Sequence, residues 1–343
     1  MTPGTERTRG LVLGKFLPPH AGHLRLLRFA EQMVDDLDVI VASVASEPIG
    51  SELRVRWMKE LIPGATVHAL TDDLPSLPEQ SPDFWPLWRT SLLRCLERPP
   101  THVFASEGYG AELARQLGAR FVPVTRPGTD DEGPIATSGT AIRRNPWEHW
   151  RHLPDVVRPH FLRRIAIAGP ESVGKSTLAA RLAKEFETVW VPEYARDWLT
   201  REGAPMDGET ARVEPGDMVM IARGHAASQR ALERSANRRL FVDTDALATT
   251  IWCEFLHGQV PEEVASIAEA EAPDLTLLLD VDVPFVPDPI RYLPEERRRF
   301  FDRYEAALQE AGRPFALIRG DFEERFRAAV DAVRAVPPPE PMP

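Results

Sequence analysis

The sequence predicts an α/β protein built from two doubly wound domains, each with a parallel sheet. The chain has 343 residues with 43% hydrophobic content, which is enough for two ordinary cores. Short apolar runs alternate with helix-like segments along the chain, a pattern typical of parallel sheets. In addition, an apolar run leads directly into a glycine-containing loop twice, at Gly14 and at Gly169. Each of these loops is expected to open one domain.

The first domain is expected over residues 1–150. Strands are predicted at residues 10–13, 38–44, 66–70, 102–105 and 121–124, and helices at residues 24–29, 54–61, 85–97, 109–117 and 137–144. Residues 126–133 are polar and rich in glycine, which indicates a surface loop.

A stretch rich in proline and tryptophan, residues 145–159, marks the expected boundary, and the second domain is predicted over residues 151–335. Its strands are expected at residues 164–168, 240–243, 275–281 and 315–318, and its helices at residues 177–186 and 295–311. The proline-rich end, residues 336–343, is predicted to be a disordered tail.

Composition excludes several classes of function. A formal charge of −11 disfavours broad binding to nucleic acid, which needs a concentrated cationic surface. No apolar run approaches the roughly 20 residues of a membrane span, and no hydrophobic leader follows the polar start. We therefore expect a cytoplasmic protein that contacts neither nucleic acid nor membrane.

The strongest motif is GPESVGKS at residues 169–176, which fits the G-x-x-x-x-G-K-[ST] pattern between a strand and a helix. A chance glycine turn is the alternative, and the strand–loop–helix context argues against it. Backbone N–H groups of such a loop wrap phosphates, and the helix N-terminus adds positive charge. We expect Lys175 to bridge the β and γ phosphates of ATP and Ser176 to ligate Mg²⁺. The residues expected to surround the nucleotide are Gly169, Glu171, Ser172, Val173, Gly174, Lys175, Ser176 and Thr177.

Acidic residues follow two strands that should end at the same edge of the sheet. Asp243 is expected to organise Mg²⁺ through water, and Asp245 or Glu193 to act as the base or hold the acceptor hydroxyls. Capping of the next helix is the alternative for both aspartates. Arg196, near Glu193, is a candidate for contact with the substrate, and the sequence does not choose between the two bases.

Arginines before and within the helix at residues 295–311 suggest a lid over ATP. Arg291 precedes the regular helix and is expected to close on the phosphates, where it would stabilise developing charge. The run at residues 297–299 is expected to be a solvated face.

A second phosphate element, GKFLPPHAGH at residues 14–23, lies in the first domain. His20 and His23 are three residues apart at a helix start, so that both imidazoles can face one phosphate. Lys15 adds a cation, and Gly14, Phe16 and Gly22 are expected to contact the bound nucleotide. No cysteine or carboxylate follows at metal-ligand spacing, and a structural histidine is the alternative.

A third element, TSGTAIR at residues 137–143, places hydroxyls and a cation at another predicted helix start. Ser138, Thr140 and Arg143 are its candidate anion ligands, although such residues also cap helices.

Through the H-x-G-H and S-x-T-x-x-R elements, residues 10–150 resemble nicotinamide mononucleotide adenylyltransferases, and residues 163–335 resemble ribosylnicotinamide kinases. The joined order resembles the bifunctional NadR-like family. The resemblance implies that His20 and His23 contact the ATP phosphates and that the S-x-T-x-x-R residues bind the phosphate chain. It further implies that Ser106 and Tyr109, in the turn SEGYG, lie near the adenine nucleotide.

The sequence departs from this family in two respects. Regulatory members carry an N-terminal helix-turn-helix, whereas only about ten residues precede the first predicted strand, so we expect no direct operator binding. Gly139 stands where serine or alanine is common, a change we expect to be tolerated. For the nicotinamide ring, Trp85 and Trp88 are stacking candidates in the first domain and Trp252 in the second, with a core position as the alternative.

The resemblance implies an enzyme that makes NAD in two steps. The kinase would phosphorylate nicotinamide riboside with ATP to the mononucleotide (NMN), and the first domain would join NMN to AMP from a second ATP. Mg²⁺ is the expected cofactor, and ATP, nicotinamide riboside, NMN and NAD are the expected small-molecule partners. The phosphate motifs also fit a kinase and adenylyltransferase for a flavin or pantetheine precursor, or a non-catalytic NAD and ATP sensor. A homo-oligomer is compatible with the sequence.

Overall fold

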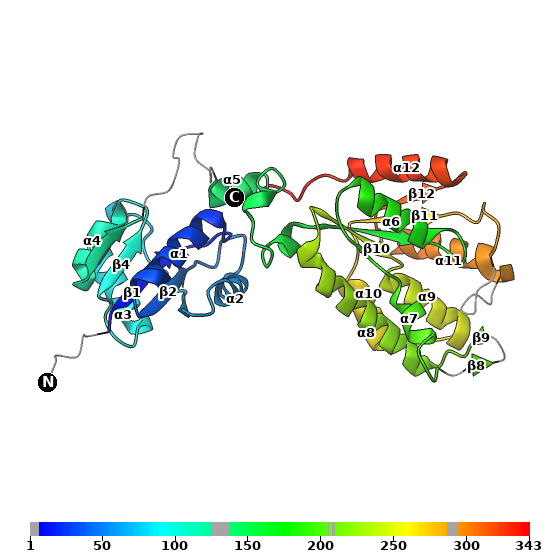
Figure 1. Ribbon diagram of the computed structural model, residues 1–343, viewed down its shortest axis with the longest axis horizontal. Helices are drawn as coiled ribbons and strands as arrows, with labels where there is room; N and C mark the ends of the chain where they lie inside the picture. The colour runs from blue at the N-terminus through cyan, green and yellow to red at the C-terminus, as the bar shows by residue number, and fades with distance from the viewer. Residues whose placement is uncertain (1–6, 125–136, 205, 208–209, 287–293) are drawn as a thin grey trace. The chain divides into compact units, whose positions relative to one another are not determined.

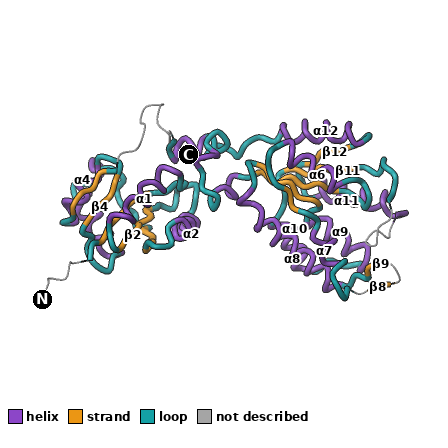
Figure 2. Tube along the Cα trace, viewed as in Figure 1, coloured by secondary structure: helices purple, strands orange, loops and turns teal. Residues whose placement is uncertain are grey.

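The computed structural model describes residues 7–124, 137–204, 206–207, 210–286 and 294–343. The chain divides into two compact units: residues 1–157 with 340–343, and residues 158–339. In each unit, helices flank a sheet of strands (Figures 1 and 2).

The first unit contains a five-stranded sheet in the order β3-β2-β1-β4-β5, and every pair of neighbours is parallel. The strands are β1 (Arg9–Gly14), β2 (Asp36–Ala42), β3 (Thr66–Leu70), β4 (His102–Ala105) and β5 (Arg120–Pro123). The strand order reverses beside β1. In such sheets a crevice opens beyond the carboxyl ends of the strands at the reversal, which is where β1 ends at Gly14.

Helices cover both faces of this sheet. They are α1 (Ala21–Met33), α2 (Ser51–Leu61), α3 (Phe84–Cys95), α4 (Tyr109–Leu117) and α5 (Gly139–Arg144), with short helices η1 (Pro78–Gln80) and η2 (Trp150–His152). Successive residues of β1 point to opposite faces. Val12 packs with Leu27 of α1 and Met58 of α2, whereas Leu11 packs with Leu92 of α3 and Leu113 of α4. The sheet therefore lies between two apolar cores.

The second unit contains a parallel five-stranded sheet in the order β12-β11-β6-β10-β7. The strands are β6 (Arg163–Ala168), β7 (Trp190–Val191), β10 (Arg239–Asp243), β11 (Leu275–Leu279) and β12 (Phe315–Ile318). The central strand β6 pairs with β10 on one side and β11 on the other. The strand order reverses beside β6, which places the second crevice at the loop after this strand.

The helices of the second unit are α6 (Lys175–Glu185), α7 (Tyr194–Leu199), α8 (Pro215–Leu232), α9 (Ala246–His257), α10 (Glu262–Ala270), α11 (Arg297–Glu310) and α12 (Phe322–Ala335). Short elements are η3 (Arg158–Phe161), η4 (Glu233–Ser235), η5 (Pro294–Glu296) and an antiparallel pair, β8 (Met206–Asp207) with β9 (Thr210–Ala211). Leu182 of α6 and Val333 of α12 share one core of the sheet, and Ile251 of α9 and Phe301 of α11 share the other. A separate core joins Met218 of α8 to α9 and α10.

The predicted fold class is confirmed, since both sheets are parallel and covered by helices. Sequence periodicity did not predict α8, α9, α10 or α12. Helix α9 is buried on more than one side, so it lacks the single apolar stripe that identifies an amphipathic helix. Helix α8 buries one face, but that face includes the polar His225 and Gln229, which weakens its apolar pattern.

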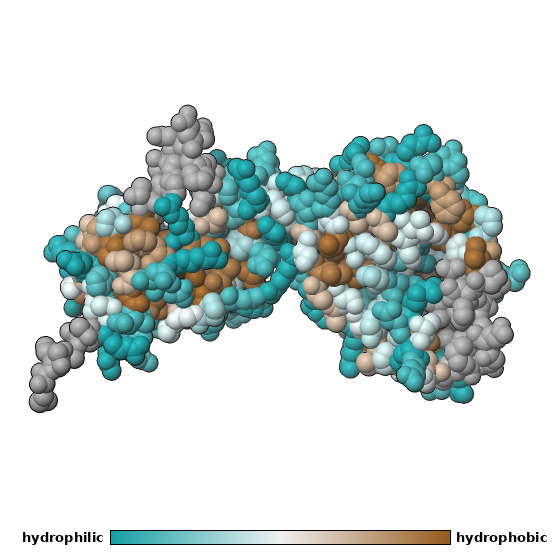
Figure 3. Space-filling view, in the orientation of Figure 1, coloured by the Kyte–Doolittle hydropathy of each residue, from teal (hydrophilic) through white to brown (hydrophobic). Residues whose placement is uncertain are grey.

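Hydrophilic residues cover most of the viewed face of each unit, with smaller apolar areas between them (Figure 3). Among the described residues, no helix has the length and apolarity needed to cross a bilayer. The C-terminal residues are irregular, and Arg163 donates hydrogen bonds to the carbonyls of Pro337 and Pro338, both at 3.1 Å. The disordered tail stays a prediction.

Candidate active sites

The crevice of the first unit contains a cavity of about 730 Å³, here called the histidine cavity. Of the predicted residues, it is lined by Gly14, Lys15, Phe16, His20, His23, Trp85, Trp88, Ser106, Tyr109, Ser138, Thr140 and Arg143. Phe16 adopts a left-handed backbone, with φ of 48°, and its ring covers Gly14, where an added Cβ would lie 3.1 Å from the ring. The loop after β1 thus turns sharply into the cavity.

The two histidines of this loop lie against each other, with ring centroids 3.8 Å apart. His20 caps α1, since its Nδ1 accepts a hydrogen bond of 3.1 Å from the backbone N–H of Gly22. The proton of a neutral His20 ring therefore lies on Nε2. Gly22 does not line the cavity, and its role is to let the chain pass the His20 ring, which a Cβ would approach to 3.0 Å.

The TSGTAIR element, residues 137–143, contacts the loop that carries His20 and His23 through the carbonyl of Leu17. Arg143 donates to this oxygen at 2.7 Å, and Ser138 caps α5 by accepting from the N–H of Ala141 at 3.1 Å. A Cβ on Gly139 would lie 2.6 Å from the same Leu17 oxygen. The two elements can approach this closely only because residue 139 is glycine, so this glycine is a requirement of the local packing.

Sequence reasoning missed two residues that support this loop. Arg54 is fully buried and donates to the carbonyl of Lys15 at 2.7 Å and to Glu47 at 2.6 Å. The other oxygen of Glu47 lies 3.0 Å from Nζ of Lys15. Burial alone would raise the pKa of Glu47, but Lys15 and Arg54 outweigh it and hold this pKa below its usual range. The ammonium group of Lys15 is therefore held at the mouth of the cavity.

The aromatic candidates of this unit have structural contacts as well. Trp85 and Trp88 pack against the core beneath α3 and line the cavity. The indole of Trp88 donates to the carbonyl of Pro75 at 2.9 Å, and the hydroxyl of Tyr109 donates to the carbonyl of Leu13 at the same distance. Trp85 and Trp88 therefore pack against the core and also border the cavity, so a core position does not exclude stacking on a bound ring.

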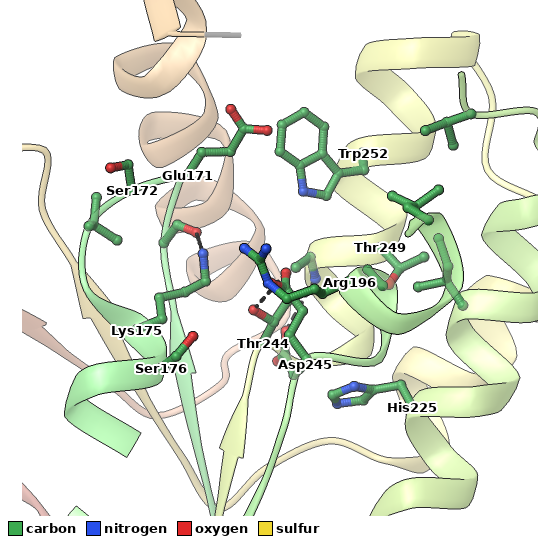
Figure 4. A pocket seen from close by; sticks show the side chains of 18 of the residues that line it. Glu171, Ser172, Lys175, Ser176, Arg196, His225, Thr244, Asp245, Thr249 and Trp252 are labelled. Carbon is green, nitrogen blue, oxygen red and sulfur yellow. Dashed lines mark hydrogen bonds between the residues drawn. The ribbon is translucent and has the colours of Figure 1, made fainter. Parts of the chain in front are cut away.

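In the second unit, the loop after β6 borders a cavity of about 180 Å³, here called the P-loop cavity (Figure 4). Of the predicted residues, it is lined by Gly169, Glu171, Ser172, Val173, Gly174, Lys175, Ser176, Thr177, Glu193, Arg196, Asp245 and Trp252. Gly169 and Gly174 have φ of 137° and 88°, values that side-chain-bearing residues rarely adopt. Lys175 donates to the carbonyls of Gly169 and Pro170, at 3.2 and 3.0 Å.

Asp243 ends β10 beneath this loop and is only 1% exposed. Burial and the neighbouring charge of Glu193 raise its pKa to about 6, against the opposing effects of Lys175, Ser176 and Thr244. Thr244 has a left-handed backbone, with φ of 66°, and donates to Glu193 at 3.3 Å. This turn brings two carboxylates to the end of the sheet where the phosphate loop begins.

Asp245 caps the next helix, which was one of the alternatives for this residue. Its Oδ1 caps α9 by accepting from the N–H of Ala248 at 3.2 Å, and it also accepts from the hydroxyl of Tyr304. Its Oδ2 is buried and has no hydrogen-bond partner among the described residues. Burial raises the pKa of Asp245, against these two hydrogen bonds. One oxygen thus fixes the side chain, and the other remains available to a ligand in the cavity.

Two arginines of the second unit, Arg297 and Arg325, make contacts that the sequence did not predict. Arg291 lies outside the described residues. The solvated face predicted for residues 297–299 is wrong for Arg297, which is half-buried and donates to the carbonyls of Ser172 and Val283 at 3.5 and 3.1 Å. Arg325 was missed: it is 2% exposed and donates to the carbonyl of Val173 at 2.6 Å. With thirty-seven arginines in the chain, no single one attracts notice in the sequence.

A protein-family model and two curated bacterial proteins are similar to this chain. A family model described as an AAA domain matches residues 164–325. The trifunctional NAD biosynthesis/regulator protein NadR of Escherichia coli (strain K12) is 29% identical over 355 residues, which cover 97% of this chain and 84% of that protein. The protein of the same description from Salmonella typhimurium is also 29% identical, with the same coverage.

Solved structures are similar over both units. A crystal structure of NadR protein in complex with NR has a TM-score of 0.78 and 24% sequence identity, over 96% of this chain and 96% of that chain. A second, in complex with NAD and AMP-PNP, has a TM-score of 0.75 and 23% identity with the same coverage. These likenesses show a shared fold.

Proposed function

The chain is homologous to the NadR proteins over nearly its whole length, and from this relationship we propose that it makes NAD in two steps at two separate sites. The second unit would transfer the γ-phosphoryl group of ATP to the 5′ hydroxyl of nicotinamide riboside, giving NMN. The first unit would join NMN to AMP from a second ATP, releasing pyrophosphate. The observation that carries the proposal is the presence of one cavity in each unit, lined by Lys175 and Ser176 in the second unit and by His20 and His23 in the first.

In the kinase step, Lys175 would exchange its bonds to loop carbonyls for the β and γ phosphates of ATP. The acceptor hydroxyl would lie beside Asp245, whose fixed side chain presents Oδ2 to receive its proton. Glu193 is the alternative base, but its carboxylate already accepts from Thr244. We favour Asp245 because a base that is held in place loses less entropy in the reaction.

Mg²⁺ fits the kinase site through Ser176 and Asp243. Among the described residues, no group of three or more His, Cys, Asp or Glu side chains could hold a metal alone. Mg²⁺ sites beside phosphates commonly use only one or two protein ligands. The pKa of Asp243 is raised to about 6 by burial and by Glu193, a crowding of negative charge that a dication would relieve. When bound, the ion would neutralise charge on the phosphates.

In the adenylyl step, an oxygen of the NMN phosphate would attack the α-phosphorus of ATP, and pyrophosphate would leave. His20 can donate from Nε2 because its Nδ1 is occupied by Gly22. Together with His23, Lys15 and Arg143 it would stabilise negative charge on the phosphates, without a covalent protein intermediate.

The test is to incubate purified protein with Mg·ATP and nicotinamide riboside, and separately with NMN, and to quantify NMN, NAD and pyrophosphate by chromatography. The proposal predicts NAD from both starting compounds. NAD from NMN alone would refute the kinase assignment. No product from either would direct the search to riboflavin and pantetheine phosphate, and absence of turnover with every acceptor would favour the sensor. A cytoplasmic location and a homo-oligomer remain predictions.

A further inference from the structure

One histidine of the P-loop cavity takes no part in the chemistry proposed above. His225, on α8, is 4% exposed, and its Nε2 has no hydrogen-bond partner among the residues that the structure describes. Burial lowers its pKa to about 4, so the ring is neutral at physiological pH. A buried polar atom without a partner is costly, and a ligand that bonds to it removes this cost.

His225 lies at the end of the cavity away from the phosphate loop. Figure 4 shows Lys175 on one side and His225 on the other, with Asp245 between them. The position of α8 is fixed by close packing, because a Cβ on Gly224 would lie 2.0 Å from the ring of Tyr194. The imidazole is therefore presented by a helix that is held against α7.

The surroundings of His225 suit a flat ring. Leu199, Met218 and Ile221 line the same cavity, and Met218 and Ile221 lie on the same buried face of α8 as His225. Trp252 lines the cavity as well, and its indole packs on Phe300 with ring centroids 4.6 Å apart, which restrains it as a stacking surface. A heterocycle bound here would meet these apolar and aromatic groups, and its polar substituent would need a polar partner, which His225 can supply.

We propose that His225 is a specificity-determining residue that hydrogen-bonds the polar substituent on the ring of the phosphoryl acceptor. This inference rests on the proposed riboside kinase activity, for which the substituent is the carboxamide of nicotinamide riboside. An acceptor whose hydroxyl lies beside Asp245 extends away from Lys175, toward α8. Because the pyridinium ring of this riboside is cationic, a neutral imidazole can approach it without the repulsion that lysine or arginine would cause.

The experiment compares two acceptors that differ only in the substituent: nicotinamide riboside and pyridinium riboside, which lacks the carboxamide. His225→Leu should lower kcat/KM for nicotinamide riboside by roughly 10- to 100-fold and for pyridinium riboside by less than about threefold. His225→Gln, which keeps a hydrogen-bonding group, should recover part of the loss. The control is His257→Leu, because His257 ends α9, also has an Nε2 without a partner among the described residues, and is not one of the residues lining the cavity.

The outcomes separate the inference from the proposed function. Equal losses on the two ribosides, or no loss on either, would overturn the role of His225 while leaving the kinase assignment intact. A wild-type enzyme that phosphorylates neither riboside would refute the kinase assignment, and the inference with it. Thermal unfolding and ATP binding establish that each variant is folded, and if His225→Leu is not, the same comparison with His225→Phe, which keeps a ring but cannot form the hydrogen bond, decides.

Discussion

Replacing Asp243 by asparagine should stabilise the second unit while abolishing riboside phosphorylation. Asp243 is 1% exposed, and both burial and Glu193 disfavour its ionised form. Asparagine keeps the shape and one acceptor oxygen but removes the charge. The kinase needs that charge beside Ser176 to help hold Mg²⁺ at the phosphates, so stability and activity should change in opposite directions.

The magnitude follows from the raised pKa. A carboxyl whose pKa rises from 3.8 to about 6 on folding costs about 3 kcal/mol of stability at neutral pH, because the folded state disfavours the ionised form. The folded state binds the proton more tightly than the unfolded state, so this cost disappears as the pH falls from about 6 toward about 4. Asp243→Asn should therefore gain about 2–3 kcal/mol near pH 7.5 and well under about 1 kcal/mol near pH 4.

The assay is unfolding in urea, with hydrogen–deuterium exchange of peptides from β6 and β12 as the readout. These peptides report on the stability of the second unit separately from that of the first. Asp331→Asn, an exposed position on α12, serves as the control and should change stability by less than about 0.5 kcal/mol. A variant that is less stable than wild type near pH 7.5, or a gain that does not shrink in acid, would refute the reasoning.

Three further predictions concern loop packing and pH. Gly139→Ala places a Cβ 2.6 Å from the Leu17 carbonyl, so NAD formation from NMN should fall at least tenfold while the same preparation still phosphorylates riboside. Arg325→Met leaves the phosphate-loop carbonyl unpaired and should destabilise the second unit by about 3–5 kcal/mol in urea unfolding, whereas exposed Arg327→Met on the same helix should cost under about 1 kcal/mol. Kinase kcat/KM should decline as the pH falls through about 6, where Asp243 takes up its proton, and a profile flat to about pH 5 would contradict this role.

The loops after β1 and β6 could be predicted from sequence because their determinants are local. Gly169 and Gly174 supply backbone angles that the loop needs, and Lys175 and Ser176 follow within the same motif. The strands before both loops are short apolar runs, which also fixes the end of the sheet where each loop lies. Fold class and loop position therefore followed from patterns within about ten residues.

The supporting residues could not be predicted because their partners are remote in sequence. Arg54 bonds Lys15 across 39 positions, and Arg325 bonds Val173 across 152. In sequence each is one arginine among thirty-seven, on a helix where a solvated position is the ordinary expectation. In each unit, however, a buried guanidinium donates a hydrogen bond to a carbonyl of the loop that follows the central strand. His225 is similar, since only the fold reveals that it lines a cavity.

The central claim is that two separate sites act in sequence, and two singly inactivated variants, assayed alone and mixed, test it most directly. Lys175→Ala should make no NAD from nicotinamide riboside but keep NAD formation from NMN, whereas Arg143→Ala should accumulate NMN and stop there. We predict that the two variants, mixed with Mg·ATP and nicotinamide riboside, will together form NAD. Loss of NAD formation from NMN in a folded Lys175→Ala variant, or loss of NMN formation in a folded Arg143→Ala variant, would contradict the account.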